Sequence, residues 1–198
     1  TKQLCLVIKM QKEFYQHLFK PTIKIFKMED FSNYFTQKVN PDVLHLINSG
    51  INYYQQQELE NSLASFNQAI VLMPENANLY TFRGNVYQDL GDNALAEKDF
   101  RKTIELRPND SHANFRLGIM YSQKNDFENA VKFLEISYRN SFGANLDLIG
   151  FGTNNLLVVS RQVICNNLGN FLGQLKRYDE AIKYLKEAIE IEPKYANP

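Results

Sequence analysis

Residues 77–110, ANLYTFRGNVYQDLGDNALAEKDFRKTIELRPND, decide the fold of this chain. Apolar side chains recur there at the three- and four-residue spacing of an amphipathic helix, first in one segment and then in a second. Gly91, Asp92 and Asn93 between the segments are typical of a turn and of a helix start. The stretch therefore predicts a helical hairpin, whose apolar residues are Tyr80, Val86, Tyr87, Leu90, Leu95, Phe100 and Ile104.

The same pattern recurs along the chain with a period of 34 residues. Glycines mark the period, with 17 extra residues before the last of them, at Gly50, Gly84, Gly118 and Gly169. Prolines report the same period and the same insertion, at Pro74, Pro108 and Pro193. The glycine spacing and the proline spacing thus both predict hairpins at 43–76, 77–110 and 111–144, an insertion at 145–161, and a fourth hairpin at 162–195.

With these positions in place, the chain resembles the tetratricopeptide repeat family. A unit of that family is a pair of antiparallel helices, with a small residue where the helices cross and a proline after the second helix. In the second hairpin the matching residues are Tyr80, Gly84, Tyr87, Ala96, Phe100, Thr103 and Pro108. The chain departs from the family at Ser49 and Arg83, where leucine is usual, and at Phe142, where proline is usual. The resemblance implies an all-α fold, a right-handed α-solenoid of helix-turn-helix units with a concave wall.

The recurring glycines need a physical reason. Glycine inside a helix costs about 1 kcal/mol relative to alanine. We expect Gly84 and Gly118 to let helix backbones approach closely, with Ala96 and Ala130 as the small residues opposite.

Two segments lie outside the hairpins. Residues 1–42 form a basic extension, with seven lysines against three acidic residues in the first 40, and apolar spacing predicts that the extension is mostly helical. It is either a cap over the first hairpin or a basic peptide for an acidic partner or membrane surface. In the insertion, Thr153 is a candidate N-cap, and the apolar series after it predicts one long helix from about Asn154 to Gly173. The overhanging part of that helix either covers the third hairpin or protrudes as a docking ridge.

Composition and motifs argue against several classes of function. The 22 basic and 22 acidic side chains cancel, so no overall field attracts nucleic acid or an anionic membrane. Two cysteines and three histidines are too scattered for a metal site. The sequence contains no glycine-rich phosphate loop and no His-Glu-x-x-His, Cys-x-x-Cys or Gly-x-Ser-x-Gly motif. We therefore expect no catalytic residue, no metal and no cofactor, and protein partners in an intracellular setting.

The resemblance also implies a binding surface, because in this family the first helix of each unit lines the concave wall. Mapped onto this sequence, the expected peptide-binding residues are Asn78, Thr81, Asn85, His112, Phe115, Arg116, Asn166, Asn167 and Asn170. An asparagine amide offers both a donor and an acceptor, which suits an extended peptide backbone. The alternative is that an asparagine-rich sequence simply places amides on its surface.

These observations favour a non-enzymatic scaffold or assembly adaptor that docks partner peptides or helices. One alternative is the recognition region of a larger enzyme, such as a glycosyltransferase with amino-terminal repeats. Another is a chaperone adaptor for an acidic tail, although the family's clamp of Lys, Asn, Asn, Lys and Arg matches one place in five in either register. At the final helix, Ile182, Leu185 and Ile189 lack a polar cover in the sequence, which predicts that missing sequence, a second copy or another subunit covers them.

Overall fold

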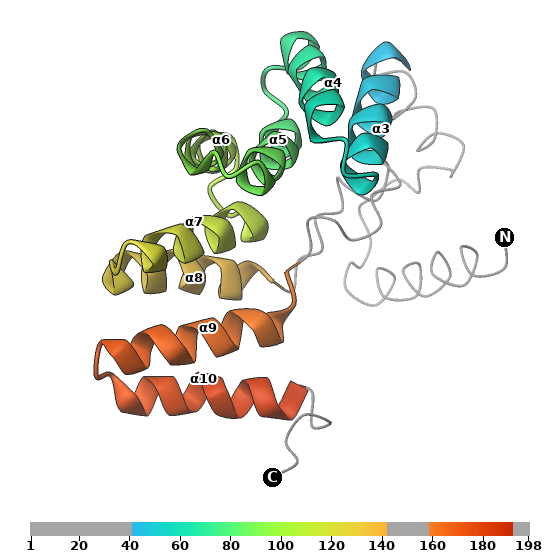
Figure 1. The fold of residues 1–198 in the computed structure, drawn as a ribbon. Helices are drawn as coiled ribbons and strands as arrows, with labels where there is room; N and C mark the ends of the chain where they lie inside the picture. The colour runs from blue at the N-terminus through green and yellow to red at the C-terminus, as the bar shows by residue number, and fades with distance from the viewer. Residues whose placement is uncertain (1–40, 142–158, 192–198) are drawn as a thin grey trace, which may run out of the picture. The chain divides into compact units, whose positions relative to one another are not determined.

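The computed structural model of this chain describes residues 41–141 and 159–191. Eight helices and no strands occupy these two ranges, which confirms the all-α expectation (Figure 1). The helices are α3 (Pro41–Gln55), α4 (Leu59–Leu72), α5 (Ala77–Asp89), α6 (Asn93–Leu106), α7 (Ser111–Gln123), α8 (Phe127–Asn140), α9 (Arg161–Gln174) and α10 (Tyr178–Ile191). Except for residues 41 and 42, which belong to α3, the predicted amino-terminal extension lies outside the described residues.

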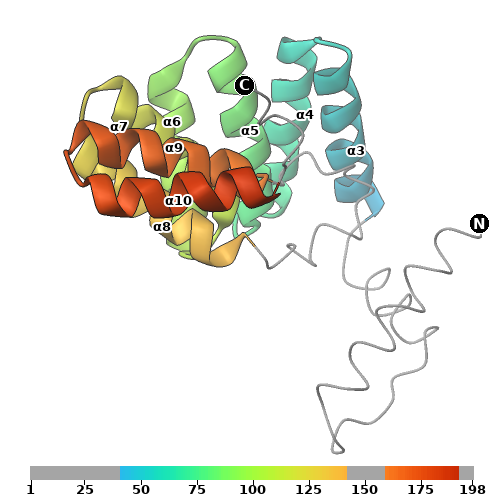
Figure 2. The same cartoon turned by 90° about the horizontal axis from the view of Figure 1, so that it is seen from below.

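The helices form four hairpins that stack in chain order. The main contacts run between helices that are consecutive in the chain, both within each hairpin and from the second helix of one hairpin to the first helix of the next. Figures 1 and 2 both show α9 and α10 side by side. Between hairpins the apolar faces merge, as where Phe66 of α4 stacks on Phe82 of α5 with ring centroids 5.4 Å apart. This linear stacking is that of an α-solenoid.

Each hairpin turns through one residue with positive φ. These residues stand at equivalent places of the repeat, at Gln57, Gly91, Asn125 and Lys176. After two of the turns, an aspartate side chain caps the second helix, since Asp92 accepts from the Leu95 amide and Asp126 from the Asn129 amide. The hairpin shape is therefore set by local turn and capping chemistry.

The repeating glycines make room for a large side chain of the partner helix. A Cβ atom on Gly84 would lie 2.8 Å from the Phe100 ring, and one on Gly118 would lie 2.9 Å from Leu134. The expectation that Ala96 and Ala130 stand opposite is therefore wrong as to the main contact, although the Ala130 carbonyl does approach Gly118. The bulky partner side chain therefore fills the space beside the glycine and joins an apolar cluster that continues into the neighbouring hairpin, as Phe100 does with Ala113 and Leu117.

In the final hairpin, too, a large side chain packs against the repeating glycine. This packing corrects the expectation that Leu185 lies on an uncovered stripe. A Cβ on Gly169 would collide with Leu185, so Leu185 points into the crossing between α9 and α10. Leu185 therefore does not belong to an uncovered stripe, whereas Ile182 and Ile189 are exposed as expected.

The insertion does not extend the next helix as expected. Val159 and Ser160 precede the helix, the backbone of Ser160 is extended, and α9 begins at Arg161. The Ser160 carbonyl accepts the first helical hydrogen bond, from the Ile164 amide. Arg161 is held in place by Glu187 of α10 and the Tyr138 carbonyl of α8, which anchors the start of the helix at this point. A single helix from Asn154 to Gly173 is thus wrong, and residues 142–158 lie outside the described part of the chain.

Candidate functional site

Two of the predicted wall residues are buried in hydrogen bonds between helices. Asn78 of α5 accepts from the Arg107 guanidinium at 2.8 Å, and the Thr81 and Thr103 hydroxyls lie 3.0 Å apart. Asn78 and Thr81 are both buried. These side chains therefore hold the second hairpin and its exit together, and their polar groups are used inside the protein.

Asn85, His112 and Arg116 form a polar chain from α5 to α7. His112 Nε2 lies 3.0 Å from Asn85 Oδ1 and 3.2 Å from Arg116 Nε. The ring nitrogen donates to Asn85 in one tautomer and accepts from Arg116 in the other. Asn85 and His112 are buried, while Arg116 is half-buried. In the tautomer whose Nε2 carries no proton, His112 accepts from Arg116 and holds its guanidinium in place.

Arg116 is half-buried and forms no direct ion pair with a described residue. Burial lowers the pKa of its guanidinium, and the nearby Tyr54 and Asp89 act in the opposite direction. Among the described residues, none has a carboxylate within ion-pair distance of Arg116. The Tyr54 hydroxyl donates to Asp89 at 2.6 Å, and its burial together with this bond raises the pKa of Tyr54 to about 12. Arg116 is thus a half-buried cation of α7, the first helix of the third hairpin, and makes no ion pair with a described residue.

The remaining predicted residues divide between surface and core. Asn166 and Asn170 of α9 are exposed. Asn167 donates to the Val163 carbonyl of its own helix at 2.8 Å, and Phe115 packs in the apolar cluster between the third and fourth hairpins. No contact in the described part of the chain joins Arg116 to the α9 amides. Helical periodicity placed the predicted residues on α5, α7 and α9, but the neighbouring side chains decide which of these positions face solvent.

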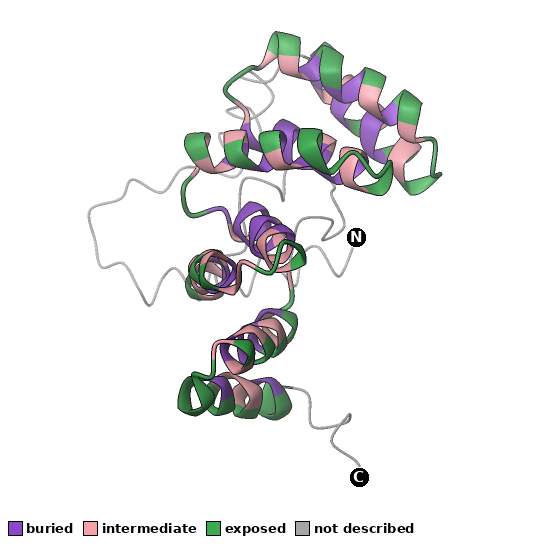
Figure 3. Ribbon diagram, turned by 60° about the vertical axis from the view of Figure 1, so that its left-hand side comes forward, coloured by how far each residue is buried: buried purple, intermediate pink, exposed green. Residues whose placement is uncertain are grey.

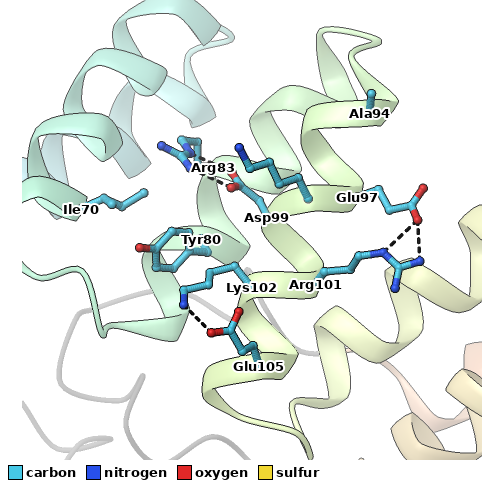
Figure 4. A pocket seen from close by; sticks show the side chains of 10 residues that line it. Ile70, Tyr80, Arg83, Ala94, Glu97, Asp99, Arg101, Lys102 and Glu105 are labelled. Carbon is cyan, nitrogen blue, oxygen red and sulfur yellow. Dashed lines mark hydrogen bonds and ion pairs between the residues drawn. The ribbon is translucent and has the colours of Figure 1, made fainter.

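A second surface, missed by the sequence analysis, lies over α4, α5 and α6. It is an open hollow of about 800 Å³, whose polar lining includes Arg83, Glu97, Asp99, Arg101 and Lys102 (Figure 4). Most of its charges are paired within the protein, as in the Arg101–Glu97 and Lys102–Glu105 contacts, both 2.7 Å. Most charges that line the hollow are therefore compensated within the protein.

Arg83, which stands where leucine is usual in the repeat, lines this hollow. Its guanidinium binds the buried Asp99 through two bonds of 2.7 Å and donates to Asn67 of α4 at 2.7 Å. The bond to Asp99 is the main reason that the pKa of Arg83 is raised. In the sequence, the sign of this ion pair is an arginine at a repeat position where leucine is usual, followed by an aspartate 16 residues later.

Neither a metal centre nor a membrane span is found in the described ranges. Within residues 41–141 and 159–191, no three His, Cys, Asp or Glu side chains gather closely enough to hold a metal ion. No helix of these ranges is long and apolar enough to cross a membrane.

Comparison with protein families agrees with the repeat spacing. Models described as tetratricopeptide repeat match residues 83–144 and 163–195, and a model described as TPR repeat matches residues 50–91. The chain belongs to the tetratricopeptide repeat family. Its stacked hairpins are tetratricopeptide units, and Arg83 is a departure from the usual unit.

Individual relatives are distant. The human Cell division cycle protein 16 homolog is 24% identical over 148 residues, which cover 75% of this chain and 23% of that protein. This chain therefore spans less than a quarter of that relative. The crystal structure of MamA superposes with a TM-score of 0.58 at 20% identity, covering 85% of this chain and 88% of MamA. The first TPR of Spaghetti (RPAP3), solved with the HSP90 peptide SRMEEVD, gives a TM-score of 0.51 at 21% identity. The match covers 68% of this chain and 94% of that chain. These structures share the tetratricopeptide fold with this chain.

Proposed function

We propose that this chain is a non-enzymatic protein-interaction scaffold whose first-helix wall binds a partner segment through Arg116. The observation that carries the proposal is the Arg116 guanidinium, half-buried, positioned by His112 and without a carboxylate partner among the described residues. A guanidinium binds a carboxylate through paired, charge-assisted hydrogen bonds. The ligand class is therefore an acidic peptide segment.

The exposed amides of α9 extend the proposed surface. Asn166 and Asn170 lie on the next first helix and can donate to and accept from a peptide backbone. The peptide in the Spaghetti structure carries two glutamates and an aspartate, which supports the general compatibility of this fold with an acidic ligand. The larger-enzyme and chaperone-adaptor alternatives stay predictions.

The test uses fluorescence anisotropy with labelled SRMEEVD as the acidic probe. We expect saturable binding that weakens at least about tenfold for Arg116→Gln, since one charge-assisted pair contributes about 1.5–3 kcal/mol. An amidated SRMQQVN peptide lacks the acidic groups. It should bind the unaltered chain and the Arg116→Gln variant no better than SRMEEVD binds the variant.

The matched control is Arg101→Gln, which removes an exposed arginine of α6 that is paired with Glu97. This variant should leave the affinity unchanged. Thermal melts establish that both variants are folded. Equal affinity of the Arg116→Gln variant and the unaltered chain, or no binding of the acidic probe, would show that Arg116 is not the anchor for an acidic segment.

A further inference from the structure

The hollow over α4, α5 and α6 lies where the second hairpin departs from the hairpins that follow it. Asp99 of α6 stands at the repeat position that Phe133 takes in α8 and Tyr184 takes in α10. Arg83 of α5 stands at a position where the third and fourth hairpins both have leucine. An ion pair in the second hairpin therefore replaces a leucine and an aromatic ring.

In the third and fourth hairpins, the aromatic ring covers the junction with the preceding hairpin. Phe133 packs on an apolar cluster shared by α6 and α7, and it stacks on Tyr121 of α7 with ring centroids 5.3 Å apart. Tyr184 of α10 meets Tyr138 of α8 edge-on, with centroids 5.1 Å apart. The repeat thus has a position for a ring between successive second helices.

Asp99 does not fill this position in the second hairpin. Its side chain is buried, and both of its carboxylate oxygens accept from Arg83 at 2.7 Å. Arg83 also donates to Asn67 of α4, so the three side chains form a polar floor from α4 to α6. Figure 4 shows Ile70 and Asp99 on opposite sides of the hollow, with Tyr80 and Arg83 between them. The hollow stays open above this floor, because an aspartate drawn towards Arg83 takes less space than a ring.

The lining of the hollow suits an aromatic side chain. Ile70 of α4 and Tyr80 of α5 contribute apolar and ring surface. Ala94 of α6 leaves space at a position where the other three hairpins have an acidic residue. The Arg83 side chain keeps 19% of its surface exposed, and a guanidinium packs favourably on the face of an aromatic ring.

The charges of the hollow favour an acidic group beside that ring. Lys98 of α6 is exposed, and no described carboxylate lies within ion-pair distance of its ammonium group. Arg101 and Lys102, by contrast, are each paired with a glutamate of α6. Figure 3 shows exposed residues along the sides of the helices that do not pack on a neighbouring helix. Lys98 is therefore accessible to a carboxylate of a bound molecule.

We propose that this hollow binds a segment of a partner protein through an aromatic side chain that has acidic residues beside it. The ring packs on Ile70, Tyr80 and the Arg83 guanidinium, and an acidic side chain pairs with Lys98. The hollow shares no residue with the first-helix wall around Arg116, so the inference does not depend on the acidic-peptide proposal.

The experiment uses the full 198-residue chain and a labelled peptide, GSEDFEDGS, in fluorescence anisotropy. We expect saturable 1:1 binding. The peptide GSEDAEDGS has the same charge and no ring, and it should bind at least about tenfold more weakly because the hollow then buries less apolar surface. The peptide GSQNFQNGS keeps the ring and lacks the acidic groups, and it should bind about two- to fivefold more weakly.

The double variant Arg83→Leu, Asp99→Phe gives the hollow the two residues of the third hairpin. A ring of the chain itself then fills the position, so the affinity for GSEDFEDGS should fall at least about tenfold. Replacing both members of a buried ion pair by apolar residues is often neutral for stability, and thermal melts establish that the variant is folded.

Lys98→Gln removes the exposed cation alone. It should weaken the binding of GSEDFEDGS about two- to fivefold and leave the binding of GSQNFQNGS unchanged. The matched control is Lys132→Gln, which alters an exposed lysine at the equivalent position of α8 and should leave both affinities unchanged.

The proposal is overturned if GSEDFEDGS does not bind, or if it binds no better than GSEDAEDGS. Unchanged affinity of the folded double variant also overturns it, as does unchanged affinity of Lys98→Gln if the double variant does not fold. Arg116→Gln should keep the preference for the ring, and its loss would place the ring on the first-helix wall. Sedimentation that shows a dimer dissociated by the double variant would make a second copy the occupant and overturn the proposal.

Discussion

Arg83 illustrates how a single departure from the repeat pattern is compensated by its surroundings. The arginine replaces a usual leucine, and its charge is neutralised by Asp99, whose side chain is almost fully buried. The guanidinium also lies 5.7 Å from the ring centroids of Tyr80 and Tyr87. Removing one member of such a pair leaves an uncompensated charge, whereas replacing both can be neutral. Arg83 and Asp99 therefore stabilise the protein as a pair, and replacing either one alone would leave the charge of the other uncompensated.

The crossing glycines lead to a prediction about stability. Gly84→Ala should lower the free energy of unfolding by about 1–3 kcal/mol, because the new Cβ would press on the Phe100 ring. Gly173→Ala is the matched control, since nothing lies within 4 Å of its Cβ position, and it should raise stability by up to about 1 kcal/mol. Urea unfolding of both variants measures this. Equal effects of the two substitutions would contradict the crossing argument.

Side chains of three helices meet at Glu187, where the last two hairpins pack together. Tyr138 of α8 donates to Glu187 at 2.6 Å, and Arg161 of α9 donates to it at 2.5 Å. Burial and the bond to Glu187 raise the pKa of Tyr138 to about 12. The Tyr138 ring also meets Tyr184 edge-on at 5.1 Å. Polar contacts therefore complement the apolar cluster where α8, α9 and α10 join.

This junction predicts a pH dependence. Burial raises the pKa of Glu187, but the bonds from Tyr138 and Arg161 and the charge of Arg161 lower it overall from its ordinary 4.5. A lowered pKa in the folded state contributes stability above the ordinary value and loses it as the pH falls through the folded value. Glu187→Gln should therefore destabilise the protein at pH 7 and make its stability fall less steeply below about pH 4.5.

Urea midpoints measured from pH 3 to pH 7 test this expectation, with Glu190→Gln on the same helix as the control. Parallel pH curves for the unaltered chain and the Glu187→Gln variant would exclude the proposed role of the junction.

At the scale of the whole stack, stability is shared between hairpins and the interfaces that join them. α5 to α8 each have neighbours on two sides, while α10 packs mainly against α9. The outer faces of the end helices also differ in chemistry, with polar residues at equivalent places of α3 and isoleucines on α10. The two ends are therefore not interchangeable.

This arrangement predicts uneven hydrogen exchange. Backbone amides of α10 should exchange faster than those of α5 to α8, because α10 packs mainly against one helix of the described residues, α9, whereas each of α5 to α8 packs between two. Exchange followed by mass spectrometry on the full chain measures the difference. Uniform protection from α5 to α10 would mean that the stack unfolds only as one cooperative unit.

The period of 34 residues was sufficient to predict the hairpins and the family, because each hairpin depends on local signals. Apolar spacing, turn residues and capping aspartates act over a few residues and are visible in the sequence. The same reasoning failed for the insertion, where apolar residues after Thr153 suggested a continuous helix. The start of α9 at Arg161 depends on contacts with Tyr138 and Glu187, which the sequence does not place side by side.

The sequence by itself determined the four hairpins of the described residues, and it indicated the first helix of each hairpin as a candidate binding surface. Only the tertiary structure decided that Asn78, Thr81, Asn85 and His112 are buried while Arg116, Asn166 and Asn170 retain contact with solvent. The physical reason is that periodicity defines the face of one helix, whereas exposure depends on the side chains that the next helices bring to that face. The same dependence removed Leu185 from the outer stripe of α10, because the space beside Gly169 receives it.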